Sequence, residues 1–152
     1  MKMLTIITAT VLLTSCQSFR DYFYREGIRP FTSDGCSLSP SGIDDKPYAF
    51  LECCVKHDYA YWQGGSLEQK EQADQALQAC IAGHSTETIG RIYHGAVSLG
   101  GGPQFTTPFR WGYGWERNRG YKPLTSQERY LVESESKKIQ WDLIYKSLQE
   151  PE

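Results

Sequence analysis

The pattern of apolar and polar positions along the chain predicts a mainly α-helical protein built on two central helices. The first is expected from about Tyr48 to Trp62, because the pair Gly64-Gly65 that follows is a typical carboxy-terminal stop for a helix. The second begins near Ser66, where the spacing Ser66-x-x-Gln69 fits a capping box, and it ends at Gly83.

Two further helices are expected towards the carboxy terminus. The first is a shorter segment around Thr86 to Val97, and the second is a long helix that opens at the capping box Thr125-x-x-Glu128 and runs to about Leu148. Its apolar stripe would consist of Leu131, Ile139, Leu143 and Leu148. The middle of this stretch, ESESKK, is poorly amphipathic, so a solvated or partly frayed terminal helix fits the pattern as well as a functional one.

Two segments lack a helical pattern and are expected to be irregular. Residues 31–47 are rich in Ser, Gly, Asp and Pro, which is typical of a loop. Residues 99–123 are dense in Gly, Pro and aromatic side chains. We interpret the rings of Phe105 to Trp115 as core side chains beside the central helices, with a lipid-contacting patch as the alternative. Arg110 has two open interpretations, a phosphate ligand or a helix cap.

The first sixteen residues, MKMLTIITATVLLTSC, combine one lysine with an apolar run that is too short to span a bilayer, which is typical of a secretory signal. The last four, Leu13-Thr14-Ser15-Cys16, resemble the lipobox of bacterial lipoproteins, which implies that Cys16 becomes the acylated first residue of the mature chain. An ordinary signal peptide that ends near Cys16 by chance is the alternative. Gln17 in the next position favours, by the same resemblance, a lipid anchor in the outer membrane of the bacterial cell envelope.

Composition limits the number of domains and the class of partner. The chain has 152 residues, of which 39% are hydrophobic and 22% charged, enough for one domain with a modest core. We expect a signal peptide at 1–15, a tether at 16–30, a folded domain at 31–124 and the carboxy-terminal helix at 125–152. A net charge of −2 argues against nucleic acid as the main partner, since phosphate binding needs a basic excess.

Four cysteines remain after the lipobox, and their even number points to two disulfides in an oxidising compartment. The adjacent residues Cys53 and Cys54 cannot easily bond each other, which leaves two possible pairings with Cys36 and Cys80. A zinc site made of Cys53, Cys54 and His57 is the alternative, although it lacks a second ligand pair at the spacing of zinc fingers.

The connection between the two central helices is short, so we expect them to fold back as an antiparallel hairpin. Facing positions in such a hairpin have residue numbers with a nearly constant sum. One register meets this condition both for Cys53 with Cys80 and for His57 with Asp74. The register therefore predicts a disulfide between the helices and an imidazole opposite a carboxylate.

The same register gives the adjacent cysteines separate roles. Cys53, His57 and Tyr61 are spaced by four residues and share one face of the first helix. Cys54 points about 100° away and would hold the preceding loop through Cys36. Each bridge would contribute about 2–4 kcal/mol, which matters for a small core.

The stretch CCVKHDYAY, residues 53–61, resembles the active-site signature of secreted phospholipases A2, in which a Cys-Cys pair precedes His-Asp, a cysteine and a tyrosine. The family's second element, an aspartate followed six residues later by a cysteine, is matched by Asp74 and Cys80. The family usually has a further bridge between the positions of Ala60 and Ala73, and here both cysteines are replaced, as the loss of one bridge requires. The resemblance covers roughly residues 35 to 80, and QGGS replaces the hairpin common between the family's two helices.

This resemblance implies a chemistry for the central helices. His57 would be the base that activates a water molecule for attack on the sn-2 ester of a glycerophospholipid. Asp74 would accept a hydrogen bond from one ring nitrogen and so fix the tautomer, and Tyr61 would help to hold that carboxylate. A buried structural His-Asp pair is the alternative.

The resemblance also implies a calcium site. Asp58, about 100° round the helix from His57, would supply a carboxylate ligand. Carbonyl oxygens of Gly35, Ser37 and Ser39 would complete a set of hard oxygen donors for Ca²⁺. The family's loop is rich in glycine around its cysteine, whereas this chain has SDGCSLSPSG. Backbone oxygens come from any residue type, so calcium ligation is compatible with this departure.

These observations favour a calcium-dependent phospholipase A2-like lipoprotein with a disulfide-stapled antiparallel helix pair. It would act as a monomer on phospholipids in a membrane. The rival function is that of a catalytically inactive envelope lipoprotein that binds lipid or a protein partner, and the unusual calcium loop motivates it. A secreted effector directed against competitor membranes is a third hypothesis, which the lipid anchor disfavours.

Overall fold

The computed structural model describes residues 27–116 and 119–150. These residues form five helices, namely α2 (Leu51–Gln63), α3 (Leu67–His84), α4 (Glu87–Gly100), α5 (Ser126–Ser136) and α6 (Trp141–Gln149). Within the described ranges, the pairing of extended residues is limited to an isolated bridge between Ile43 and Lys46. The mainly α-helical class is therefore confirmed. The signal peptide, Cys16 and most of the tether lie outside the described residues.

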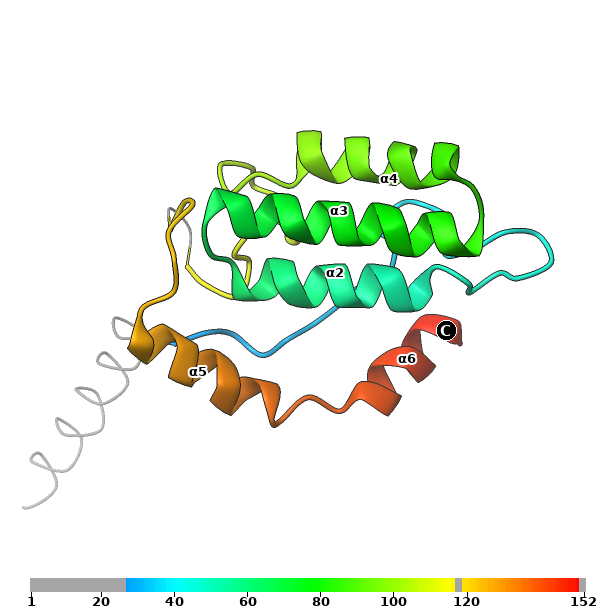
Figure 1. Ribbon diagram of the computed structural model, residues 1–152. Helices are drawn as coiled ribbons and strands as arrows, with labels where there is room; N and C mark the ends of the chain where they lie inside the picture. The colour runs from blue at the N-terminus through cyan, green and yellow to red at the C-terminus, as the bar shows by residue number, and fades with distance from the viewer. Residues whose placement is uncertain (1–26, 117–118, 151–152) are drawn as a thin grey trace, which may run out of the picture.

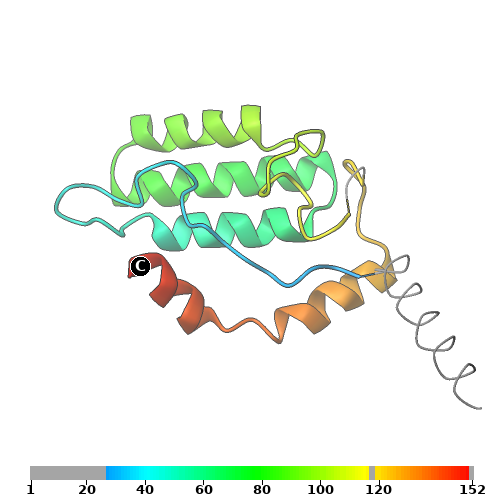
Figure 2. The same ribbon diagram turned by 180° about the vertical axis from the view of Figure 1, so that it is seen from behind.

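Three helices form one layer, with α3 between α2 and α4 (Figure 1). The carboxy-terminal helices α5 and α6 lie on the other side of α2, so that α2 is covered on two sides. The chain from residue 27 to residue 50 crosses one face of this arrangement before it enters α2 (Figure 2). This path brings the loop that precedes α2 close to the three-helix layer.

The turn between α2 and α3 is as tight as the glycine pair predicts. Gly64 has φ of 65°, and a Cβ atom there would lie 2.8 Å from the Cα atom of Gly112. The position therefore requires glycine for its backbone conformation and for the close approach of a second chain segment. The predicted capping box is present, since Ser66 and Gln69 exchange hydrogen bonds at the start of α3. The hairpin of α2 and α3 is thus fixed by its turn as well as by its packing.

The aromatic segment before α5 belongs to the core, as the sequence predicts. Trp111, Tyr113 and Trp115 are buried in a cluster with Trp62, whereas Phe105 is exposed. The indole nitrogens donate to backbone carbonyls, for example from Trp115 to Gln63 at 2.6 Å. Burial of these rings is therefore combined with satisfied polar edges, which fixes their positions.

Arg110, for which the sequence left two interpretations open, is buried in this aromatic segment. Its guanidinium donates to the carbonyl of Trp115 at 3.1 Å. This hydrogen bond links two residues of the same loop.

The prediction of one long carboxy-terminal helix is wrong. α5 ends at Ser136 and α6 begins at Trp141, although the capping box of Thr125 and Glu128 is present. The ESESKK stretch offers no apolar stripe, so packing does not stabilise a continuous helix through it. The break lets α6 bend back, and the ring of Trp141 lies 5.5 Å from that of Phe31.

Most residues of the predicted apolar stripe pack against the core, although they lie on two helices and the segment between them. Leu131, Ile139 and Leu148 pack against the aromatic cluster, whereas Leu143 is exposed.

In the part of the chain that the structure describes, no helix combines the length and apolar character needed to cross a bilayer.

Candidate active site

Two disulfides tie the start of α2 to its surroundings. Cys53 is bonded to Cys80 of α3, and Cys54 is bonded to Cys36 of the preceding loop. This is the pairing that the hairpin register predicts. The two bridges hold α2 in two directions about 100° apart, one turn before His57, and so limit how this turn can move relative to α3 and the loop.

His57 and Asp74 lie opposite each other across the hairpin. Nε2 of His57 is 2.9 Å from Oδ1 of Asp74, and the two residues are only 8% and 1% exposed. Because a carboxylate only accepts, the neutral ring carries its proton on Nε2 and leaves Nδ1 as the basic nitrogen. Burial lowers the pKa of His57 below its usual range, although the hydrogen bond and charge of Asp74 oppose this. The imidazole is therefore neutral at rest and able to accept a proton.

Asp74 receives donors on both carboxylate oxygens. The phenol of Tyr61 donates to Oδ1 at 2.7 Å, and the ammonium of Lys70 donates to Oδ2 at 2.7 Å. The hydroxyl of Ser98 is a more distant donor, 3.4 Å from Oδ2. Burial opposes ionisation, but the hydrogen bonds from His57, Lys70 and Tyr61 outweigh it and lower the pKa of Asp74. The carboxylate is thus charged and held in one orientation.

Tyr61 is positioned by its neighbours on α2 and after α4. Its ring centroid is 4.1 Å from that of His57, and the backbone of Gly101 packs against its hydroxyl. Burial and the charge of Asp74 raise the pKa of Tyr61, so the phenol stays protonated and remains a donor. Gly101 is needed here because a Cβ atom at this position would lie 2.5 Å from the Tyr61 oxygen.

A cavity of about 510 Å³ opens beside His57 and Asp58. Its walls are mainly apolar and include Leu38, Leu77, Tyr93, Val97, Pro108 and Phe109. The phenol of Tyr93 donates to the carbonyl of Pro40, which links α4 to the loop on the other side of the cavity. A pocket with mainly apolar walls and a few polar groups suits a ligand that combines a hydrocarbon chain with a polar reactive group.

Asp58 is a second buried carboxyl group, and it lines the cavity. It is 5% exposed and accepts a hydrogen bond from the hydroxyl of Ser33. Burial raises the pKa of Asp58 to about 8, and the charge of nearby Asp34 adds to this effect. A cation close to this group would favour its ionised form at neutral pH.

The loop beside Asp58 has an unusual backbone. Gly35, Ser37 and Leu38 all have positive φ, with values of 74°, 31° and 56°. For the two residues other than glycine, this conformation costs about 1–2 kcal/mol each, and such strain is typical of functional loops. Ser37 also donates to the carboxylate of Asp34 at 2.6 Å.

The residues around Asp58 fit a hard cation such as Ca²⁺. Gly35, Ser37 and Ser39, the expected loop ligands, line the same cavity as Asp58. The available donors are carboxylate, hydroxyl and carbonyl oxygens, which is the set that Ca²⁺ prefers.

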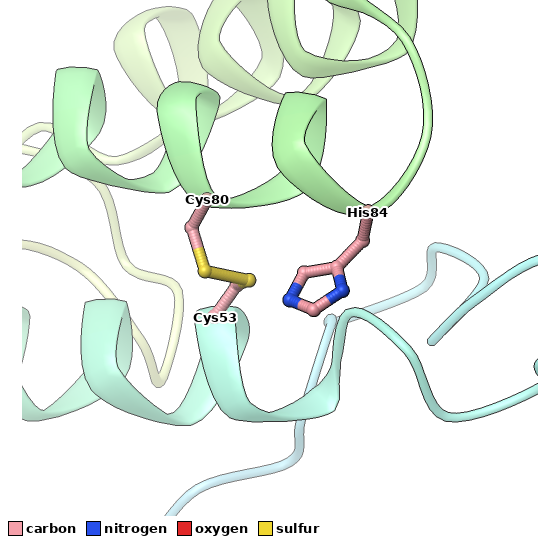
Figure 3. A group of neighbouring side chains, drawn as sticks. All are labelled: Cys53, Cys80 and His84. Atoms are coloured by element: carbon pink, nitrogen blue, oxygen red, sulfur yellow. A yellow bond between two sulfur atoms is a disulfide. The ribbon is translucent and has the colours of Figure 1, made fainter.

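The cysteines do not offer a second metal centre while they are bonded to each other. Figure 3 shows the imidazole of His84 beside the Cys53–Cys80 bridge, and the potential ligand atoms of the three residues lie within 4.8 Å of one another. Metal binding by cysteine needs a thiolate, and both sulfurs are in the disulfide. The same reason excludes the zinc site of Cys53, Cys54 and His57 in this oxidised form.

The sequence pattern did not point to three of the polar residues at this site. Lys70 could have been found, because a lysine four residues before an aspartate on a helix is placed to pair with it. Ser33 and Asp34 reach Asp58 through the fold of an irregular loop, for which the sequence carries no comparable signal.

Comparisons of this chain with protein-family models, with curated proteins and with solved structures found no match. Function is therefore inferred from the site itself. His57, Asp74 and Tyr61 are joined by hydrogen bonds, and Asp58 lines the same cavity as His57.

Proposed function

We propose that this protein is a calcium-dependent phospholipase of the A2 type, which hydrolyses the sn-2 ester of glycerophospholipids. The observation that carries the proposal is the 2.9 Å contact between His57 and Asp74 at the wall of an apolar cavity. The buried carboxyl group of Asp58 at the same cavity supports the calcium requirement. We also propose that the chain is a monomer, anchored to the outer membrane through a lipid on Cys16.

The residues of the site can perform this hydrolysis as follows. An acyl chain packs against the apolar side chains of the cavity, which brings its ester beside His57. Nδ1 of His57 takes a proton from a water molecule while the water oxygen forms a bond to the ester carbonyl carbon. Asp74 stabilises the resulting imidazolium through the Nε2 hydrogen bond. His57 then gives its proton to the glycerol oxygen as the ester bond breaks, which releases a fatty acid and a lysophospholipid.

Asp58 and the carbonyl oxygens of Gly35, Ser37 and Ser39 would hold the calcium ion. When bound, Ca²⁺ supplies Lewis acidity that polarises the ester carbonyl. With a pKa of about 8, Asp58 is largely protonated at neutral pH in the metal-free protein, so calcium binding would release a proton.

The test is release of fatty acid from vesicles of phosphatidylethanolamine and phosphatidylglycerol, with Ca²⁺ or with a chelator. We expect hydrolysis that depends on calcium, that falls at least about 100-fold in His57→Ala, and that falls similarly in Asp58→Asn. The matched control for Asp58→Asn is Asp45→Asn, at an exposed loop position, which should leave the rate unchanged.

Calorimetry with Ca²⁺ separates the proposal from its rival. We expect wild type to bind Ca²⁺ and Asp58→Asn to lose this binding. If hydrolysis by wild type does not exceed that of His57→Ala, the enzyme is ruled out. Vesicle binding without calcium binding or hydrolysis would instead favour an inactive lipid-binding lipoprotein.

A further inference from the structure

Lys70 is a charged side chain with almost no contact with solvent. It is 4% exposed, and lysine is rarely buried to this extent unless it is paired. Its Nζ atom lies 2.7 Å from Oδ2 of Asp74, 3.3 Å from the carbonyl oxygen of Val97 and 5.4 Å from the ring centroid of Tyr61. These contacts place the ammonium directly behind the carboxylate that faces His57.

The two oxygens of Asp74 have different partners. Oδ1 accepts from Nε2 of His57 and from the phenol of Tyr61, whereas Oδ2 accepts from Lys70. A strong donor on Oδ2 resists rotation of the carboxylate, and Oδ1 is thereby kept towards His57. If Lys70 were replaced, the hydroxyl of Ser98 would be a weaker donor to Oδ2 of Asp74, because it lies 3.4 Å away.

The groups around the Asp74 carboxylate come from different helices, so the contact between Lys70 and Asp74 is more than an ion pair within one helix. Lys70 and Asp74 are one turn apart on α3, while Val97 belongs to α4 and lines the cavity. The ammonium of Lys70 also donates to the carbonyl oxygen of Val97, and so links the cavity wall to the Asp74 carboxylate. His57 reaches the same carboxylate from α2, so three helices meet at this point.

We propose that Lys70 is a positioning residue for the base, because its ammonium holds the Asp74 carboxylate in the orientation that keeps the proton of neutral His57 on Nε2. Without this donor the carboxylate can move away from the ring, so that Nε2 loses its acceptor and the ring can adopt the other tautomer, with the proton on Nδ1. That tautomer cannot accept a proton at Nδ1, the nitrogen that serves as the base. The effect on catalysis rests on the proposed function, whereas the effect on the tautomer does not.

The experiment compares Lys70→Met, which keeps an apolar stem, with Lys70→Gln, which keeps a donor without the charge. Lys56→Met is the control, since Lys56 precedes His57 in the chain but its side chain is 68% exposed and pairs with Glu52 on the surface. Nitrogen-15 NMR of the histidine ring at one fixed pH gives the tautomer without substrate. Vesicle hydrolysis gives kcat and KM separately, and near-ultraviolet circular dichroism checks the fold.

We expect wild type and Lys56→Met to show the Nε2–H form of His57. Lys70→Met should show a mixture of tautomers and a kcat at least about 10-fold lower, with KM within about twofold. Lys70→Gln should lie between wild type and Lys70→Met in both measurements. A residue that served stability alone would lower the unfolding temperature without changing the tautomer of the folded protein.

The positioning role is overturned if a folded Lys70→Met or Lys70→Gln keeps the wild-type tautomer and kcat. It is also overturned if wild type lacks the Nε2–H form, or if neither variant folds, because Lys70 would then be a requirement of the fold itself. Absence of hydrolysis by wild type would defeat the proposed function alone, since the NMR comparison needs no substrate.

Discussion

At the residue scale, the orientation of His57 depends on the buried carboxylate of Asp74, which is kept charged. Asp74 is 1% exposed, yet its pKa is lowered, because the donors from His57, Lys70 and Tyr61 outweigh the effect of burial. Removal of either the carboxylate or its cation would leave an uncompensated charge in a dry environment. The same interactions therefore support both the fold and the orientation of the imidazole.

This leads to a prediction on how stability depends on pH. The pKa of Asp74 is lower in the folded chain than its ordinary value of 3.8, so the ionised group stabilises the fold above that pH. The contribution is lost as the pH falls through the lower folded-state pKa. We expect Asp74→Asn to reduce the free energy of unfolding at pH 7 by about 3–5 kcal/mol, because Lys70 stays buried without its ionic partner.

Urea unfolding of wild type and Asp74→Asn between pH 7 and pH 2 would measure this dependence. The difference between the two proteins should shrink below about pH 4. Asp45→Asn, at an exposed loop position, is the control and should follow wild type throughout. If the free energies of unfolding of wild type and Asp74→Asn differ by the same amount from pH 7 to pH 2, the lowered pKa of Asp74 is contradicted.

At the element scale, local signals in the sequence predicted the helices well and their packing only in part. The capping boxes at Ser66 and Thr125 are both present, because they depend on residues three positions apart. The constant-sum register also placed His57 opposite Asp74, since a short turn leaves two helices little freedom. The poorly amphipathic stretch ESESKK indicated a weak helix, but the position of the break at residues 137–140 also depends on how α6 packs against rings that are distant in the chain.

The site residues on the helices could be predicted from their spacing along the chain, whereas those in the loop could not. His57, Tyr61 and Asp74 lie on regular helices, where spacing gives direction. Ser33 and Asp34 lie in a loop whose path is fixed by the Cys36–Cys54 bridge and by positive φ angles at Ser37 and Leu38. No periodic pattern encodes such a path, so their position beside Asp58 could not be read from the sequence.

The end of α4 gives a prediction at this scale. A Cβ atom at Gly101 would lie 2.5 Å from the Tyr61 hydroxyl and 2.6 Å from the carbonyl oxygen of Val97, so Gly101→Ala must shift these groups relative to each other. We expect the shift to disturb the hydrogen bond from Tyr61 to Asp74. We expect kcat for vesicle hydrolysis to fall about 10-fold.

Gly95→Ala is the matched control for this substitution, because it lies within α4 and a Cβ atom there meets nothing within 4 Å. It should leave the rate unchanged and raise the free energy of unfolding by about 0.5–1 kcal/mol through helix propensity. Equal rates for Gly101→Ala and Gly95→Ala would mean that the position of the Tyr61 hydroxyl does not matter for hydrolysis.

At the scale of the whole molecule, helix α2 is covered by the carboxy-terminal helices on one side and also lines the cavity. The helices α5 and α6 cover α2 away from α3 (Figure 1). The cavity is lined by residues of α2, α3, α4 and the loops. Leu38 lines this cavity, and its side chain is fully exposed. Under the proposed function, an apolar side chain in this position would contact a lipid surface while the ester enters the cavity.

We therefore expect Leu38→Asn to weaken hydrolysis of vesicles about 10-fold and to change hydrolysis of a monomeric short-chain phospholipid by less than about twofold. Asparagine tolerates the positive φ of this position better than leucine does, so the loop should keep its shape. Leu143→Asn is the control, because Leu143 is also exposed but lies on α6, away from the cavity. Vesicle sedimentation would show whether the loss is in binding. If both substrates slow equally, Leu38 acts inside the cavity and the lipid surface is contacted elsewhere.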